Sequence, residues 1–202
     1  MFDFSTLFGI SFLSFIAYEY FSNNELIYVK SNIDGKEYQV RNLPDKQEAS
    51  DLIAKMNSKV EKLIQIMQKK HSQDERTHLL TKNYKPSSIT ESLSNSKYTS
   101  YAVNKGEKIV FCIRDKDEEK KLINENLMTF VVIHEVAHLC TKSIGHTEEF
   151  WNNFKFLLEI ATKHDLYIVV DYSDKPEEYC GMNVTTTPLD DEFIEKFRMN
   201  SS

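Results

Sequence analysis

One segment of the chain constrains the fold more than any other, because it is almost wholly apolar until it reaches three ionisable side chains. The segment runs from residue 127 to residue 138, and its last five residues, HEVAH, extend from His134 to His138. The apolar part is shorter than the roughly 20 residues that cross a bilayer, so it predicts a helix buried in a protein core. The HEVAH motif therefore lies on a helix.

The spacing of the two motif histidines predicts a metal site. Residues four apart lie about 40° from each other around a helix axis, so His134 and His138 present their imidazoles to one metal ion. A catalytic zinc ion needs a third protein ligand and keeps one position open for water. We expect His146, which follows Gly145, to be that ligand. The carboxylate alternatives are Glu148, Glu149 and Glu159.

Glu135 directly follows the first predicted ligand, so its carboxylate can reach a metal-bound water molecule. A carboxylate in this place takes a proton from the attacking water and passes it to the leaving amine. The sequence therefore predicts a zinc peptidase with one Zn²⁺ held by His134, His138 and His146, and with Glu135 as the catalytic base. In the competing interpretation the histidines are unrelated core or surface residues. That interpretation leaves unliganded imidazoles beside a buried carboxylate, which costs free energy.

The residues after the motif predict a reversal of the chain into a second helix. We expect residues 143–145 to stop the first helix, with Gly145 in the left-handed conformation that often follows a helix end. Thr147 is then suited to cap the next helix, whose first turn carries two acidic residues. This reversal returns His146 toward the motif.

The stretch from Tyr101 to Pro188 resembles the WLM family of zinc metallopeptidases, which are relatives of the SprT-like proteases. The matching residues are HEVAH with Gly145-His146 and Phe150-Trp151, flanked by Asn104-Lys105-Gly106, Asn126-Leu127-Met128 and Tyr179-Cys180-Gly181. The resemblance implies an α+β, zincin-like domain in which the HExxH helix packs on a small, mainly antiparallel sheet. It also implies zinc binding by the three histidines, catalysis by Glu135 and a protein or peptide substrate. Some members of the family act on DNA-crosslinked or ubiquitin-like-modified proteins, but substrate does not transfer with the motif.

The charge of the chain argues against a nucleic-acid partner. The formal net charge is −6, and acidic residues outnumber basic ones from residue 171 to the end. A protease that tracks DNA needs a basic face, and the only compact basic cluster, residues 69–71, is typical of a solvated helix end. Two other functions stay open. One is a scaffold that keeps the zinc fold without turnover, and the other is a protease associated with nucleic-acid-bound proteins.

The N-terminal segment predicts a membrane anchor. Residues 4–18 carry no charge and lie between Asp3 and Glu19. A helix packed on the domain and a cleaved signal peptide are the alternatives. Lys30, Lys36 and Arg41 follow the segment, so the positive-inside rule places the catalytic domain on the cytosolic side of the membrane. Without an anchor we expect a cytoplasmic protein.

The three cysteines agree with a reducing compartment. Cys112, Cys140 and Cys180 are odd in number and widely spaced, which is unlike a disulfide framework. We therefore expect three reduced thiols that act as small core residues.

We expect three regions: the anchor at 1–23, a hairpin, long helix and loop at 24–97 that packs on the catalytic domain, and the catalytic region at 98–202. In the middle region, Asp34-Gly35 predicts a turn between strands 26–30 and 38–41. A helix should follow, capped by Asn42 or Asp45 and continuing to about His71. Residues 82–97 have a loop composition.

The catalytic region should open with a second hairpin, formed by residues 98–103 and 108–114. By analogy with zincins, residues 109–113 would be an edge strand that binds the substrate backbone, or else an ordinary sheet strand. Tyr172 and Tyr179 are candidates for stabilising an oxyanion, although packing or structural hydrogen bonding suits either better. Thr187-Pro188 predicts the start of a short terminal helix.

Overall fold

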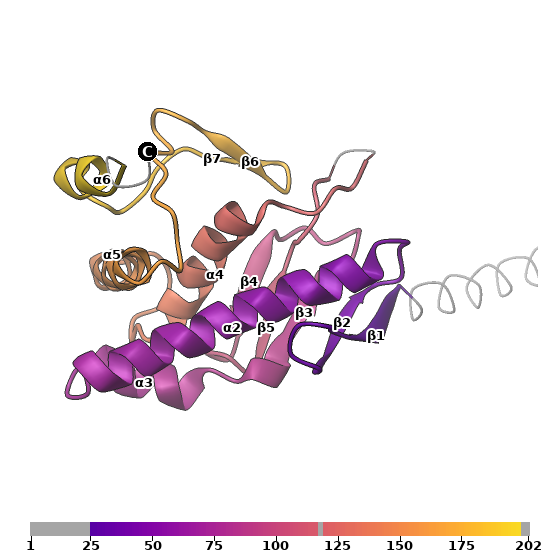
Figure 1. The fold of residues 1–202 in the computed structure, drawn as a ribbon, viewed down its shortest axis with the longest axis horizontal. Helices are drawn as coiled ribbons and strands as arrows, with labels where there is room; N and C mark the ends of the chain where they lie inside the picture. The colour runs from indigo at the N-terminus through magenta and orange to yellow at the C-terminus, as the bar shows by residue number, and fades with distance from the viewer. Residues whose placement is uncertain (1–24, 117–118, 199–202) are drawn as a thin grey trace, which may run out of the picture.

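The computed structural model describes residues 25–116 and 119–198, which form a mixed α+β fold (Figure 1). In chain order the elements are β1 (Leu26–Lys30), β2 (Glu37–Arg41), α2 (Lys46–Lys70), α3 (Glu75–Asn83), the 3₁₀ turn η1 (Pro86–Ser88), β3 (Ile89–Glu91), β4 (Ser100–Val103), β5 (Lys108–Phe111), α4 (Glu125–Leu139), α5 (Glu148–Lys163), β6 (Glu177–Tyr179), β7 (Met182–Val184) and α6 (Asp191–Arg198).

The main sheet has five strands in the order β1-β2-β3-β5-β4, and it is mixed instead of mainly antiparallel. The outer pairs, β1 with β2 and β4 with β5, are antiparallel, whereas β2 with β3 and β3 with β5 are parallel. The expectation was wrong because β3 lies in residues 82–97, which we predicted to be loop. The helical crossover through α2 and α3 makes β3 enter the sheet in the direction of β2.

The edge strands of the sheet are β1 and β4. The analogy with zincins predicted an edge strand at residues 109–113, which instead overlap the internal strand β5. Strand β5 is internal because it pairs with β3 on one side and with β4 on the other, and its Ile109, Val110 and Phe111 are all buried. A strand buried on both faces reads as a continuous apolar run. The analogy therefore selected the strand next to the true edge.

The helices place the HEVAH segment at the centre of the core. Helix α2 packs on β1, β2 and β3, while α4 packs on β4 and lies between α2 and α5 (Figure 1). Helix α4 is buried along most of its length, as its composition predicted. The predicted end of α2 is confirmed by its C-cap at His71, and its N-cap is Asp45. The short helix α3 was not foreseen.

The predicted membrane segment, residues 4–18, lies outside the described residues. No helix within 25–116 and 119–198 is long and apolar enough to cross a membrane. The predicted boundary between residues 97 and 98 stays a prediction, and strands from both sides of it join in the same sheet.

The cysteine prediction was wrong for two of the three residues. Cys112 and Cys180, which are 68 residues apart, form a disulfide, whereas Cys140 is a free, buried thiol. The pairing depends on the β6–β7 hairpin, which we did not predict and which brings Cys180 against the end of β5. Sequence spacing alone contains no sign of that approach.

Candidate metal centre

The structure gathers the three predicted ligands at one point. His134 and His138 project from successive turns of α4, with ring centroids 5.2 Å apart, and His146 projects from the loop before α5. The Nε2 atoms of His134 and His146 are 3.0 Å apart, and ligand nitrogens of all three residues lie within 4.8 Å of one another. In a tetrahedral zinc site with Zn–N bonds of about 2.0–2.1 Å, the nitrogens lie about 3.3 Å apart. The donor set therefore fits one zinc ion.

Phe150 holds the three imidazoles in this arrangement. Its ring is fully buried and stacks on His138 with centroids 4.2 Å apart. It makes T-shaped contacts with His134 and His146, with centroids 4.9 and 4.7 Å apart. The N-cap of α5 fixes where Phe150 lies, because the Oγ1 atom of Thr147 accepts the backbone N–H of Phe150. The predicted cap at Thr147 is thereby confirmed.

Helix α4 ends at Leu139, four residues earlier than the stop predicted at 143–145. Three side chains from other elements satisfy the carbonyls left free at this helix end. Asn83 donates to the carbonyl of Leu139 at 2.8 Å, and Asn153 donates to that of Cys140 at 3.3 Å. Lys105 Nζ donates to the next two carbonyls, those of residues 141 and 142, at 2.7 and 2.9 Å. The loop that carries His146 is thus held from its carbonyl side.

Glu149 holds the same loop from its amide side. Its two carboxylate oxygens accept the backbone N–H groups of Lys142 and Ser143 at 2.9 and 3.0 Å. These backbone bonds, with help from Ser143 Oγ, lower the pKa of Glu149 to about 2. Gly145, with a φ of +82°, adopts the predicted left-handed conformation and completes the turn into His146. Glu149 therefore supports the loop. The group of possible metal ligands contains the three histidines, and none of the carboxylate alternatives Glu148, Glu149 and Glu159 belongs to it.

The environment of His134 and His138 keeps both imidazoles neutral, the form in which imidazole binds a metal. Burial, followed by the neighbouring imidazoles, lowers the pKa of His134 to about 3. Burial, His146 and Lys105 lower the pKa of His138 to about 4. Beside them, Glu135 is only 6% exposed, and burial raises its pKa to about 7.

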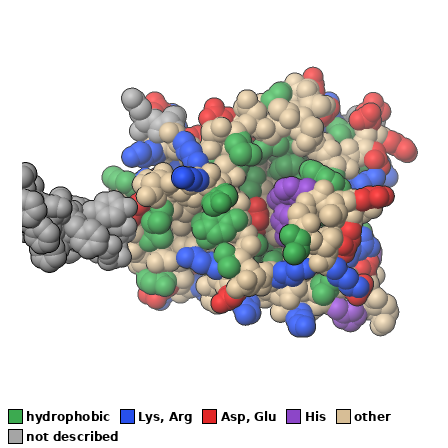
Figure 2. All heavy atoms as spheres, turned by 180° about the vertical axis from the view of Figure 1, so that it is seen from behind, with side chains coloured by type: hydrophobic (Ala, Val, Ile, Leu, Met, Phe, Trp, Pro, Cys, Tyr) green, Lys and Arg blue, Asp and Glu red, His purple; other side chains and the backbone are tan. Residues whose placement is uncertain are grey.

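Two adjoining cavities meet at His134 and Glu135. One, of about 460 Å³, runs between β4 and the loop with His146. The other, of about 240 Å³, has a largely apolar wall. That wall is formed by Phe130, Val131, Trp151, Phe154, Met182 and Val184. On the face drawn in Figure 2, histidine side chains gather beside a hollow rimmed by hydrophobic side chains. The arrangement can hold an extended chain across the metal site.

The two tyrosine candidates occupy different places. Tyr172 is fully buried, packs its ring on Phe130 with centroids 4.8 Å apart, and lines neither cavity. Tyr179 lines the smaller cavity together with Glu135, but its hydroxyl donates to the carbonyl of Cys112 at 2.7 Å and lies 2.5 Å from Ser100 Oγ. Structural hydrogen bonding therefore accounts for Tyr179.

Sequence reasoning missed the supports of the site. The sequence suggested no function for Lys105 of the Asn104-Lys105-Gly106 turn. The position of its side chain depends on the positive φ angles of all three residues. A side chain at Gly106 would collide with the backbone oxygen of Asn83, so only glycine allows this turn to approach the end of α3. The Asn-Lys-Gly turn signal was the one available hint.

The comparison with protein-family models finds no match. A crystal structure of a Wss1 mutant from Saccharomyces cerevisiae is a structural neighbour with a TM-score of 0.47 and 20% identity. The match covers 63% of this chain and 92% of the chain in that crystal structure. A shorter match of 69 residues, at 38% identity, covers 34% of this chain and 38% of the uncharacterized protein 136R of Invertebrate iridescent virus 6. Protein 042R of Invertebrate iridescent virus 3 matches at 39% identity over 69 residues, with 34% of this chain and 42% of that protein covered.

A longer similarity extends over most of the chain. The uncharacterized protein R325 of Acanthamoeba polyphaga mimivirus is 32% identical over 165 residues, which cover 80% of this chain and 83% of that protein. Identity at this level over this length indicates common descent and a shared fold. The chain therefore belongs to the same protein family as R325 of Acanthamoeba polyphaga mimivirus.

Proposed function

We propose that the protein is a zinc metalloendopeptidase of the WLM type. One observation carries the proposal: three imidazoles converge so that their ligand nitrogens lie within 4.8 Å of one another, and a buried carboxylate lies beside them at the junction of two cavities. His134, His138 and His146 would hold the ion and leave one position open. Bound there, zinc would supply Lewis-acid polarisation of the scissile carbonyl and acidify water.

The protein's own residues supply the proton transfers. Glu135 is next to the first proposed ligand in the chain and lines both cavities, so it would face the attacking water and the substrate together. It would accept the proton of the attacking water and deliver it to the leaving amine. Its burial excludes bulk water from the carboxylate, which strengthens its electrostatic interaction with the reacting groups.

The substrate would bind along β4. This strand is the edge of the sheet and lines the larger cavity through Ser100, Tyr101 and Ala102. The outer edge of such a strand has backbone donors and acceptors that an extended peptide can pair with. The smaller cavity, with its apolar wall, would accept a hydrophobic side chain next to the scissile bond.

Metal analysis combined with a cleavage assay tests the proposal. The wild-type chain should contain one zinc ion and cleave itself or denatured casein. Glu135→Gln should keep the zinc and lose activity by about 100- to 10,000-fold, the usual contribution of a general base. His134→Ala should lose both zinc and activity. Glu148→Gln, an exposed glutamate at the start of α5, is the matched control and should behave as wild type.

Two outcomes would contradict the proposal. Full activity of Glu135→Gln would remove the assigned base, and a folded wild-type chain that refuses zinc would remove the metal site. Stoichiometric zinc with no cleavage of any substrate would instead favour the non-catalytic scaffold.

A further inference from the structure

The two cavities at His134 and Glu135, which we call the cleft, contain few charged side chains. Apart from the histidines, only Lys105 and Glu135 are basic or acidic among the described residues that line the cleft, although charged residues make up 28% of the chain. Lys105 Nζ already donates to the carbonyls of residues 141 and 142, and Glu135 is the proposed base. A charged side chain of a substrate would therefore find no spare counter-ion in the described lining.

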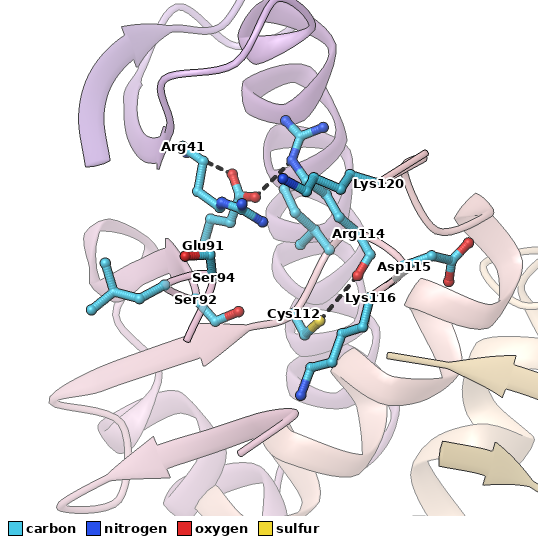
Figure 3. Close-up of a pocket in the computed structure, with 11 residues that line it drawn as sticks. Arg41, Glu91, Ser92, Ser94, Cys112, Arg114, Asp115, Lys116 and Lys120 are labelled. Atoms are coloured by element: carbon cyan, nitrogen blue, oxygen red, sulfur yellow. Dashed lines mark hydrogen bonds and ion pairs between the residues drawn. The ribbon is translucent and has the colours of Figure 1, made fainter. Parts of the chain in front are cut away.

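Charged side chains gather instead around a separate cavity of about 220 Å³ near the end of β3 (Figure 3). There Glu91 accepts the backbone N–H of Arg41 at 2.7 Å and the Nε–H of Arg114 at 2.8 Å. The same cavity is also lined by Asp115, Lys116 and Lys120. It shares no lining residue with the cleft. The low charge of the cleft is therefore a property of that site and not of every cavity in the chain.

Large hydrophobic side chains are exposed along the rim of the cleft (Figure 2). Ile144, in the loop before α5, is 92% exposed and lines the larger cavity, as Tyr101 of β4 does. Trp151 of α5 is exposed and lines the smaller cavity, and Met182 of β7 is exposed and lines both. Single exposed hydrophobic residues are common, but a group of them around a concave surface is typical of a binding site.

These side chains lie on both sides of the candidate metal site. The two cavities meet at His134 and Glu135, and Tyr101 and Ile144 line only the larger one, whereas Trp151 lines only the smaller one. An extended peptide paired with the outer edge of β4 would cross from one cavity to the other. Peptide side chains on each side of the crossing point would then contact an apolar surface.

We propose that the cleft selects extended polypeptide segments that lack charged side chains and carry large apolar side chains on both sides of the metal site. The inference rests on the proposed function, because it assigns a class of substrate to the same site. Apolar side chains gain free energy from burial in the cleft, whereas a charge would lose hydration without gaining a partner. Segments of this composition are buried in folded proteins, so the substrate would be an unfolded stretch of polypeptide.

Peptide binding followed by the fluorescence of Trp151, the only tryptophan of the chain, tests this proposal without requiring cleavage. The probe is a short peptide of glycine and serine with two leucines and blocked ends, and the protein is the full chain with Glu135→Gln, which leaves the peptide intact. Binding should be saturable, and replacing the leucines by serine should weaken it about tenfold or more. Aspartate or lysine in place of the serines next to the leucines should each weaken it about tenfold. The same order is expected for the wild-type chain in a chelator, which keeps the Glu135 carboxylate.

Substitutions of exposed residues connect the binding to the cleft. Ile144→Ser should weaken binding of the leucine peptide about threefold or more, whereas Ile168→Ser, at an exposed isoleucine that lines neither cavity, should leave it unchanged. Met182→Lys adds a positive charge where both cavities are lined by the same side chain. It should make the aspartate peptide bind more tightly than the lysine peptide.

Several results would overturn the inference. They are a Trp151 signal that no peptide changes, charged peptides that bind as tightly as the leucine peptide, and equal effects of Ile144→Ser and Ile168→Ser. Cleavage of casein by the wild-type chain at sites as rich in charged residues as casein itself would also refute the selectivity, while leaving the peptidase proposal intact. Peptide binding in the expected order by a chain that never cleaves would refute the peptidase instead and would support the selectivity of the cleft.

Discussion

Replacing Phe150 by leucine is expected to weaken zinc binding much more than a matched change one helical turn away. Phe150 contacts all three imidazoles, whereas Phe154 on the same helix contacts only His134, with centroids 5.1 Å apart. Both rings are buried, so Phe150→Leu and Phe154→Leu should lower the free energy of unfolding by similar amounts, about 1–2 kcal/mol. The pair separates packing on the three histidines from packing in the core.

The expected effect on the zinc dissociation constant follows from the conformational freedom that each imidazole regains when the phenylalanine ring beside it is removed. Immobilising a side chain on binding costs about 0.5–1 kcal/mol at the lower end of the usual range. Three freed imidazoles then weaken zinc binding by about 1.5–3 kcal/mol, which is roughly a 10- to 100-fold rise in Kd. One freed imidazole in Phe154→Leu gives about a two- to fivefold rise.

Competition with a chromophoric chelator measures the two dissociation constants, and urea unfolding of the metal-free proteins measures stability. The reasoning is refuted if the two variants raise the zinc Kd equally, or if Phe150→Leu leaves it at the wild-type value. Failure of the wild-type chain to bind zinc would instead count against the proposed function.

Three further predictions concern other parts of the chain. Because hydrogen bonds hold the pKa of Glu149 at about 2, below its ordinary 4.5, its stabilising contribution is complete above pH 4.5 and is lost as pH falls toward 2. The stability difference between wild type and Glu149→Gln should shrink over that range in urea unfolding, and a constant difference would contradict the assignment. Replacing Cys112 and Cys180 together by serine opens a loop of 68 residues and should lower the free energy of unfolding by about 4 kcal/mol. Thermal unfolding measures this loss of stability. A wild-type Tm that is the same with and without reductant would show that the disulfide is absent. Residues 4–18 should retain the full chain in the membrane fraction after carbonate extraction, whereas release into the supernatant would rule out a spanning anchor.

The candidate site was predictable because its main features are local. The four-residue spacing of HEVAH places two imidazoles on one side of any helix, and Thr147 can cap only the helix that follows it. The choice of His146 over three nearby carboxylates agrees with the group that the structure assembles. Whether that group binds zinc stays a prediction.

The errors lie where residues far apart in the sequence meet. The loop composition of residues 82–97 hid β3, whose three residues are held in the sheet by β2 and β5 on either side. With β3 inserted, β5 becomes internal and β4 becomes an edge of the sheet. One missed strand therefore changed both the expected sheet type and the strand expected to bind a substrate. The disulfide was missed for the same reason, since it depends on an unforeseen hairpin.

The sequence by itself determined which residues could bind a metal and which helix would carry them, because side-chain periodicity and capping depend on neighbours a few positions away. Only the tertiary structure decided what surrounds them: the Lys105 and Glu149 bonds that hold the loop with His146, and the Phe150 ring against three imidazoles. These contacts follow from burial and strand pairing summed over the whole chain, and no short stretch of sequence encodes that sum.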